Sequence, residues 1–266
     1  MIDLHCHYLP GIDDGAQTVD ESLALARAAV ADGITHAVMT PHVHIGVFDN
    51  RAGSIERAVE ELRTALVRHG VPLTISAGGE VRIGAELIEL LSAGDLPFLG
   101  HLNGQRVMLL ELPHGQVPVG AEQFTGWLRK HGVLPLIAHP ERNKDVMRNL
   151  SKLDPFIGQG CLLQVTAGSL VGSFGEPAQR RARELLDRGD IFAVATDAHN
   201  LANRPPMLSA ARAFIATDAG EAAADALTRG NPCRLLGHLP HYALNTAKHV
   251  PADPLPAGGS NPRPAG

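Results

Sequence analysis

Histidines and carboxylates recur along this sequence in short groups that suit metal binding. The chain of 266 residues contains 14 histidines but only seven phenylalanines, two tyrosines and one tryptophan. Histidine is the commonest metal ligand in proteins and the usual proton carrier near neutral pH. An excess of histidine can also reflect surface composition, so the positions of these residues must decide. The groups are His5-Cys6-His7, Asp13-Asp14, His42-Val43-His44, Glu80, Glu111, His139-Pro140-Glu141-Arg142 and Asp197-Ala198-His199.

The spacing within two of these groups lets a pair of side chains share one ion. Residues i and i+2 of a strand point to the same face, so His5 and His7 can bind one ion together. Asp197 and His199 can do the same if their strand extends that far. Cys6 should point away from its two histidine neighbours, into the core.

Seven short apolar runs alternate with helical patterns, which is typical of βα units and a mostly parallel sheet. We expect strands over residues 1–7, 35–40, 73–77, 107–112, 133–139, 161–166 and 191–196. We expect helices over residues 18–31, 54–69, 85–91, 121–131, 144–157, 176–188, 207–216 and 219–229. The first helix opens with the capping-box spacing of Thr18 and Glu21.

The uniform composition of these units predicts one α/β domain over residues 1–249, closed into a barrel with seven strands. An open, doubly wound sheet is the alternative, but no glycine-rich phosphate loop of a familiar pattern is present. Residues 250–266 are rich in proline, glycine and alanine and cannot bury a core, so we expect a disordered tail.

Six of the seven predicted strands end at metal-capable side chains. In barrels of this kind the chemistry lies at the carboxyl ends of the strands, so five histidines, two aspartates and two glutamates would converge there. Packing alone would not place carboxylates at the ends of apolar strands, because an unpaired buried carboxylate is costly. One catalytic ion typically keeps three or four protein ligands, so this set predicts two or three divalent ions. Nitrogen and oxygen donors without thiolate fit Mn²⁺, Fe²⁺, Zn²⁺ or Mg²⁺.

Charge and composition exclude several other classes of protein. The net charge of -5, without a basic stripe, argues against nucleic acid as a partner. No apolar run approaches the roughly 20 residues that span a bilayer, and the start, Met1 to His5, lacks the features of a signal peptide. Three cysteines without a C-x-x-C pair fit a reducing compartment, which makes the cytoplasm the expected location.

The order and spacing of these motifs resemble the polymerase-and-histidinol-phosphatase (PHP) superfamily. Within it, the sequence is most similar to the bacterial metal-dependent protein-tyrosine phosphatases encoded with capsule and exopolysaccharide synthesis systems. The resemblance covers about residues 1–240, and it includes Asp13-Asp14-Gly15, Arg204-Pro205-Pro206 and Asn231-Pro232. It implies a distorted (β/α)7 barrel of the PHP type, a site for three metal ions with manganese as the expected ion, and a tyrosine-phosphorylated protein as substrate. That protein would be a bacterial tyrosine autokinase.

The same resemblance assigns roles to individual residues. Arg142 and Arg204 would contact the phosphate, while metal ions would lower the pKa of water and supply hydroxide for in-line attack. The resemblance does not assign the general acid; a tyrosyl leaving group needs little protonation, and His44 and His114 are the candidates for this role. By motif match, the metal ligands would be His5, His7, Asp14, His42, Glu80, Glu111, His139, Asp197 and His199.

One segment departs from the family pattern. Residues 43–48 contain His44 where these phosphatases often carry arginine or lysine beside the mouth of the site. His44 is therefore either an extra substrate contact or simply exposed.

Other mechanisms and functions fit these residues less well. A cysteine phosphatase is excluded because Ile12, Ala167 and Leu239 stand where a C-x₅-R loop would need arginine. The nearest alternative is a phosphatase for small phosphomonoesters such as histidinol phosphate. An amidohydrolase-type deaminase or lactonase is a further alternative, but it would require a metal-bridging lysine at the end of the fourth predicted strand, where this chain has Glu111. An inactive PHP scaffold is disfavoured because a dead site tends to lose ligands.

Overall fold

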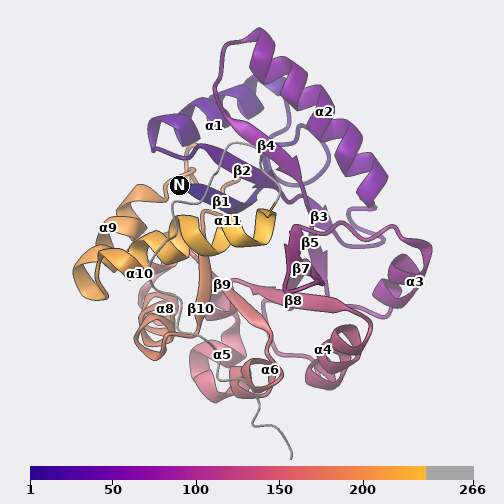
Figure 1. The fold of residues 1–266 in the computed structure, drawn as a ribbon, viewed down its shortest axis with the longest axis vertical. Coiled ribbons are helices and arrows are strands. Elements are labelled where there is room, and N and C mark those ends of the chain that lie inside the picture. Colours follow the sequence, from indigo (N-terminus) through magenta and orange to yellow (C-terminus); the bar gives the residue numbers. More distant parts are fainter. Residues whose placement is uncertain (238–266) are drawn as a thin grey trace, which may run out of the picture.

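The chain forms a distorted barrel of parallel strands with helices packed around its outside (Figure 1). This computed structural model describes residues 1–237. The expected domain boundary at residue 249 and the tail over residues 250–266 therefore lie outside the described residues. Within the described part, no helix is both long and apolar enough to cross a bilayer.

All seven predicted strands are present, and their hydrogen bonding follows chain order around the barrel. The strands form two hydrogen-bonded sheets, one in the order β1-β2-β4 and the other in the order β10-β9-β8-β7-β5-β3. The backbone amide of His7 donates to the carbonyl of Ala198 at 2.9 Å, so the chain after β10 lies beside the end of β1. The strands are β1 (Ile2–Cys6), β2 (His36–Met39), β3 (His42–Val43), β4 (Thr74–Ala77), β5 (Glu80–Arg82), β6 (Gly100–Leu102), β7 (Gln105–Glu111), β8 (Val133–Ala138), β9 (Leu162–Thr166) and β10 (Ile191–Ala195).

Three short strands, β3, β5 and β6, were not predicted. Strands β3 and β5 continue β2 and β4 after a break at Pro41 and at the glycine pair Gly78 and Gly79. A Cβ atom on Gly79 would lie 2.4 Å from the ring of Pro97, so the chain can turn here only without a side chain. The turn aims β5, which begins at Glu80, at the mouth of the barrel.

Two of the expected helices differ from the prediction, and three short helices, Pro140–Arg142, Ala167–Leu170 and Asn231–Leu236, were not predicted. The expected helix over residues 144–157 is divided, because the Asn149 side chain accepts a hydrogen bond from the amide of Ser151 and starts a new turn. The expected helix over residues 219–229 changes to π-helical geometry halfway. The helices are α1 (Val19–Ala31), α2 (Ala52–Arg68), α3 (Glu86–Ala93), α4 (Ala121–Lys130), η1 (Pro140–Arg142), α5 (Lys144–Arg148), η2 (Leu150–Leu153), α6 (Asp154–Gly158), α7 (Ala167–Leu170), α8 (Glu176–Arg188), α9 (Ser209–Asp218), α10 (Glu221–Asp225), η3 (Ala226–Gly230) and α11 (Asn231–Leu236).

Two apolar clusters hold the barrel together. The larger one lies between the strands and the surrounding helices, and the smaller one fills the inside of the barrel with residues such as Ile2, Leu109 and Leu136. Helix α11 covers the amino-terminal end of the strands, where the Asn231 amide donates to the carbonyl of Phe192 at 2.8 Å (Figure 1). The barrel is therefore closed at one end, and polar chemistry is left to the other.

Candidate metal centre

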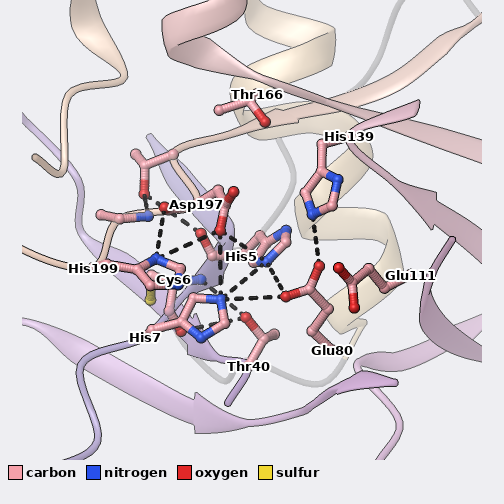
Figure 2. A network of polar contacts seen from close by, with 12 residues as sticks. His5, Cys6, His7, Thr40, Glu80, Glu111, His139, Thr166, Asp197 and His199 are labelled. Atoms are coloured by element: carbon pink, nitrogen blue, oxygen red, sulfur yellow. Dashed lines mark hydrogen bonds and ion pairs between the residues drawn. The ribbon is translucent and has the colours of Figure 1, made fainter. Parts of the chain in front are cut away.

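Four buried side chains at the carboxyl end of the barrel point toward one another (Figure 2). His5 lies in β1 and His7 directly follows it, Glu80 begins β5, and Asp197 follows β10. The register between β1 and β2 shifts between Asp3 and Cys6, where β1 has one more residue than its partner. Such a bulge re-aims the side chains that follow it. It accounts for the turn from apolar residues inside the barrel to histidines at its mouth.

The spacing of these four side chains fits a bound cation. His5 Nε2 lies 3.2 Å from His7 Nε2, 3.2 Å from Glu80 Oε2 and 3.3 Å from Asp197 Oδ1. His7 Nε2 lies 3.4 Å from each of the same two oxygens. Five of the six distances among these four atoms have this length, and a regular tetrahedron with edges of about 3.3 Å has corners about 2.0 Å from its centre, which is a metal–nitrogen bond length. The four atoms therefore enclose a space of the size of one metal ion.

The hydrogen bonding of the carboxylates supports the same conclusion. Glu80 Oε2 and Asp197 Oδ1 are buried, and neither accepts a hydrogen bond within the described residues. Burying a carboxylate oxygen without a partner is costly. A metal cation beside these two oxygens would supply the missing partner.

Two further groups extend this arrangement toward the surface. The second group contains His7, Asp14, His42 and His199, and Asp14 Oδ1 lies 3.3 Å from His42 Nε2 and 3.2 Å from His199 Nε2. The third group contains His42, Glu80 and Glu111. Because His7, His42 and Glu80 each belong to two groups, neighbouring ions could share ligands.

His139 stands apart from these three groups but touches one of their members. Its Nε2 lies 2.7 Å from Glu80 Oε1, the carboxylate oxygen that faces away from His5 (Figure 2). All nine side chains that the motif match named therefore lie together at the mouth of the barrel.

Buried polar residues orient the histidine rings. The Nδ1 atoms of His5 and His7 lie 2.9 Å from Gln164 Oε1 and 2.7 Å from Asp13 Oδ2. Both oxygens can only accept, so each Nδ1 carries the proton and each Nε2 offers a lone pair toward the metal group. A Cβ atom on Gly15 would lie 2.1 Å from the carbonyl oxygen of His7, so this close turn requires glycine.

The electrostatics of the site favour the metal-binding form of two donors, Glu80 and His199. Burial works against the charged form of Glu80, but His5 and His139 outweigh it and hold the carboxyl pKa well below its usual value. Burial, together with the nearby His7, lowers the pKa of His199 to about 4. Glu80 is therefore an anion and His199 a neutral imidazole at pH 7, which are the forms that bind metal ions. At His5, His7 and His42 burial works against the charged form, but nearby carboxylates outweigh it and raise the pKa, so a bound cation would displace their protons.

Two arginines meet the same carboxylate from the open side of the site. Arg204 Nη2 lies 2.5 Å from Asp197 Oδ2, and Arg142 Nη1 donates to the same oxygen. The ring of Phe174 lies 4.4 Å from the guanidinium carbon of Arg142, which is cation–π geometry. Both guanidinium groups therefore stand beside the metal group, where they could bind an anion.

An open cavity of about 240 Å³ gives access to these residues. It is lined by Asp14, His42, Glu80, Glu111, Leu112, His114, Ala138, His139, Pro140, Arg142, Asn143 and Arg204. Partial burial, Arg142 and Lys144 lower the pKa of His114, which makes this residue a poor proton donor at pH 7. His44 lines a different hollow, together with Arg82 and Leu87.

The backbone at Asp197 corrects one sequence-based expectation. Strand β10 ends at Ala195, so Asp197 and His199 do not share a strand face. Asp197 instead adopts a left-handed conformation with φ of 53°, and His139 does the same with φ of 31°. Such conformations are uncommon for residues other than glycine and cluster at functional sites.

Sequence reasoning gave no role to several residues that shape the site. Asp13 had a signal, because it adjoins Asp14, and Gln164 had a weaker one as a polar residue inside an apolar strand. Glu141 is fully buried and accepts hydrogen bonds from the amide of Thr166 and the hydroxyl of Ser169. It thereby fixes the turn between His139 and Arg142, and nothing in the sequence pattern reveals this contact.

The barrel and its cluster of histidines and carboxylates define a metal-dependent hydrolase of the PHP type. The family described as "Capsular polysaccharide synthesis, CpsB/CapC" matches residues 1–237, and the chain belongs to this family. The tyrosine-protein phosphatase YwqE of Bacillus subtilis is 39% identical over 204 residues, which cover 77% of this chain and 79% of that protein. The tyrosine-protein phosphatase CpsB of Streptococcus pneumoniae is 29% identical over 245 residues, covering 89% and 98%.

The fold is shared with a solved structure. The matching structure belongs to a study of crystal structures of YwqE from Bacillus subtilis and CpsB from Streptococcus pneumoniae, which are described as metal-dependent tyrosine phosphatases. The TM-score is 0.82 at 36% sequence identity, over 89% of this chain and 94% of that chain. The distorted barrel that the sequence predicted is thus confirmed.

Proposed function

We propose that this protein is a metal-dependent phosphatase that hydrolyses phosphotyrosine on a protein. The observation that carries the proposal is the double engagement of Asp197: Oδ1 faces His5 and His7, and Oδ2 binds Arg142 and Arg204. This arrangement places groups suited to a phosphoryl oxygen directly beside groups suited to a metal ion. Membership of the capsule-synthesis family and the names of its relatives support the same reaction.

The residues that would hold two or three divalent ions are the nine named above, with Mn²⁺ as the expected ion. Ions bound there would supply a Lewis acid and an activated nucleophile near neutral pH. The protein's own part is to position the ester: Arg142 and Arg204 would grip and neutralise the phosphoryl oxygens. Gln164 and Asp13 would keep His5 and His7 in the metal-binding tautomer.

A phosphotyrosine substrate suits the proton donors that the cavity offers. His114 lines the cavity with a lowered pKa, and His44 lines another hollow. Without a strong acid, an ester whose leaving group needs little protonation reacts best, and phenol has a pKa of about 10. We therefore favour aryl over alkyl phosphates.

The substrate in the cell is proposed to be a tyrosine-phosphorylated protein of capsule or exopolysaccharide synthesis, specifically the tail of a bacterial tyrosine autokinase. The family description supports the pathway. The reaction would take place in the cytoplasm, in keeping with the cysteines at positions 6, 161 and 233, which are free and buried.

The test compares kcat/KM on a phosphotyrosine peptide, a phosphoserine peptide and histidinol phosphate at equal metal loading. We expect the phosphotyrosine peptide to be the best substrate, and activity to require metal. A preference of about tenfold or more for histidinol phosphate would replace this proposal with a small-molecule phosphatase.

A further inference from the structure

A second hollow lies beside the cavity that holds the metal-binding side chains. We call it the side hollow, and we define it by Val171, Phe174, Arg204, Pro205 and Met207, which line it together with smaller residues. Arg204 lines both spaces. Whatever Arg204 grips therefore lies next to the side hollow.

The lining of the side hollow is mostly apolar, although Ser173, Thr196 and Asn203 also line it. Among the described residues that form it, Arg204 is the one charged side chain, and its guanidinium is already engaged by Asp197. Met207 is 50% exposed and Val171 is 39% exposed, which is high for large apolar side chains that share a hollow. An apolar ligand group would remove this surface from water, whereas a charged group would find no side chain of opposite charge that is free to pair with it.

The side hollow is built before any ligand arrives. The loop that carries Phe174 begins and ends with glycines in positive-φ conformations, Gly172 at 91° and Gly175 at 83°. A Cβ atom on Gly168 would lie 2.9 Å from the Phe174 ring, so the ring packs directly on the backbone of α7. Arg142 also holds the ring, through the cation–π contact. A Phe174 side chain held in this way favours binding, because the loop that carries it needs little further ordering when a ligand binds.

The position of Arg204 sets how far the side hollow lies from the bound phosphoryl group. Arg204 lines both the metal-side cavity and the side hollow, so a phosphoryl group that Arg204 grips lies beside the side hollow. An extended chain advances about 3.3 Å per residue. The tyrosyl side chain holds the peptide backbone several ångströms from the phosphoryl group, so an apolar side chain one or two residues away would reach the side hollow by lying back alongside the tyrosyl ring.

We propose that the side hollow is a subsite for an apolar side chain, such as leucine, that flanks the phosphotyrosine in the substrate protein. This inference rests on the proposed function. It makes the enzyme selective for sequence around the phosphotyrosine, which the metal groups and the arginines alone would not do.

The experiment uses the full-length chain loaded with Mn²⁺ and short phosphotyrosine peptides with a glycine and serine background. Leucine or aspartate is placed in turn at each of the two positions on either side of the phosphotyrosine. We expect leucine at one of these positions to raise kcat/KM roughly tenfold over glycine, mainly through KM. Aspartate at that position should give no gain.

Variants of Met207 connect this preference to the side hollow. Met207→Asp should abolish the advantage of leucine, and Met207→Leu should retain it. Val67→Asp changes a residue on α2 that is 78% exposed and should keep the wild-type preference. Turnover of p-nitrophenyl phosphate, which has no flanking residues, should be unchanged in all three variants.

Four results would overturn the inference. Equal kcat/KM for leucine and glycine at every position would show that no apolar subsite exists, although phosphotyrosine turnover would leave the proposed function standing. A leucine preference that survives Met207→Asp would place the subsite elsewhere. A parallel loss of p-nitrophenyl phosphate turnover in Met207→Asp would show that the side hollow holds the phosphorylated ring itself. If no phosphotyrosine peptide were hydrolysed, the proposed function would fail as well.

Discussion

Nη2 of Arg204 donates a hydrogen bond of 2.5 Å to Oδ2 of Asp197, which lies seven positions earlier in the sequence. The other oxygen of Asp197 lies 3.3 Å from Nε2 of His5 and accepts no hydrogen bond within the described residues. One carboxylate thus connects an arginine suited to phosphate with histidines suited to metal. Changes at Asp197 should disturb both functions, whereas changes at Arg204 should disturb only one.

The first prediction concerns the carboxylates that belong to the metal group. Glu80→Ala and Asp197→Ala should each lower kcat by roughly 100-fold or more, because a displaced ion misplaces the reacting groups. The circular dichroism spectrum should be retained, since both residues lie at the mouth of a barrel whose core is apolar. His44→Ala is the control and should keep near-normal kcat, because His44 lines a separate hollow. Near-normal kcat in either carboxylate variant at saturating metal would mean that the site is misassigned.

The second prediction concerns the grip on the phosphoryl group. Arg204→Ala should raise KM for phosphotyrosine, phosphoserine and small phosphate esters to a similar extent, because it removes a contact with the group they share. The metal content of the purified variant should equal that of the wild type. If the ratio of kcat/KM between esters collapsed instead, Arg204 would be contacting the leaving group.

The third prediction tests the orientation of a histidine ring. Asp13→Asn should weaken metal affinity by roughly 10- to 100-fold, because the His7 ring loses the carboxylate that fixes its tautomer. Metal titration followed by recovery of activity measures this change. Asp187→Asn replaces an exposed aspartate on α8 and is the matched control. Equal metal affinity in wild type and Asp13→Asn would show that the contact with His7 is not needed for binding.

The fourth prediction concerns removal of metal. Elemental analysis of protein purified without chelator should find at least two transition-type ions per chain, as the three groups of donors suggest. Chelation should abolish activity and lower the Tm, since an ion at 100 times its Kd stabilises the folded state by about 2.7 kcal/mol. Adding Mn²⁺ back should restore both. A metal-free preparation with full activity would contradict the proposed mechanism.

The fifth prediction concerns a buried histidine away from the metal groups. Burial lowers the pKa of His36 to about 4 from 6.5, and its Nε2 lies 2.9 Å from the hydroxyl of Ser76. Between these two pH values the unfolded chain takes up a proton at His36 that the folded chain excludes. The contribution to stability is therefore complete above pH 6.5 and is lost as the pH falls, by about 2 kcal/mol between pH 7.5 and pH 5.

The measurement is urea unfolding at both pH values in the presence of a chelator, so that metal binding does not enter. His36→Leu should lose less stability between the two pH values than the wild type. His69→Leu, at an exposed position, should keep the wild-type pH dependence. Identical pH dependence in His36→Leu and the wild type would show that His36 does not contribute.

The sequence alone determined the seven βα units and the donors at their ends. Apolar runs and helical periodicity are local properties, so they predict strands such as β8 and helices such as α8 within a few residues. The parallel order of the units then forces the strand ends to one end of the barrel. His5 and Glu80 could be assigned to one site for this reason, although they are far apart along the chain.

The tertiary structure decided the contacts that depend on irregular backbone. The bulge in β1, the glycine turn before Glu80 and the left-handed conformation of Asp197 each re-aim a side chain without a periodic signal in the sequence. The pairing of Asp197 with two arginines, and the packing of Phe174 on Arg142, join segments that periodicity cannot relate. Local sequence sets which elements form, but only packing among distant segments sets where an individual atom lies.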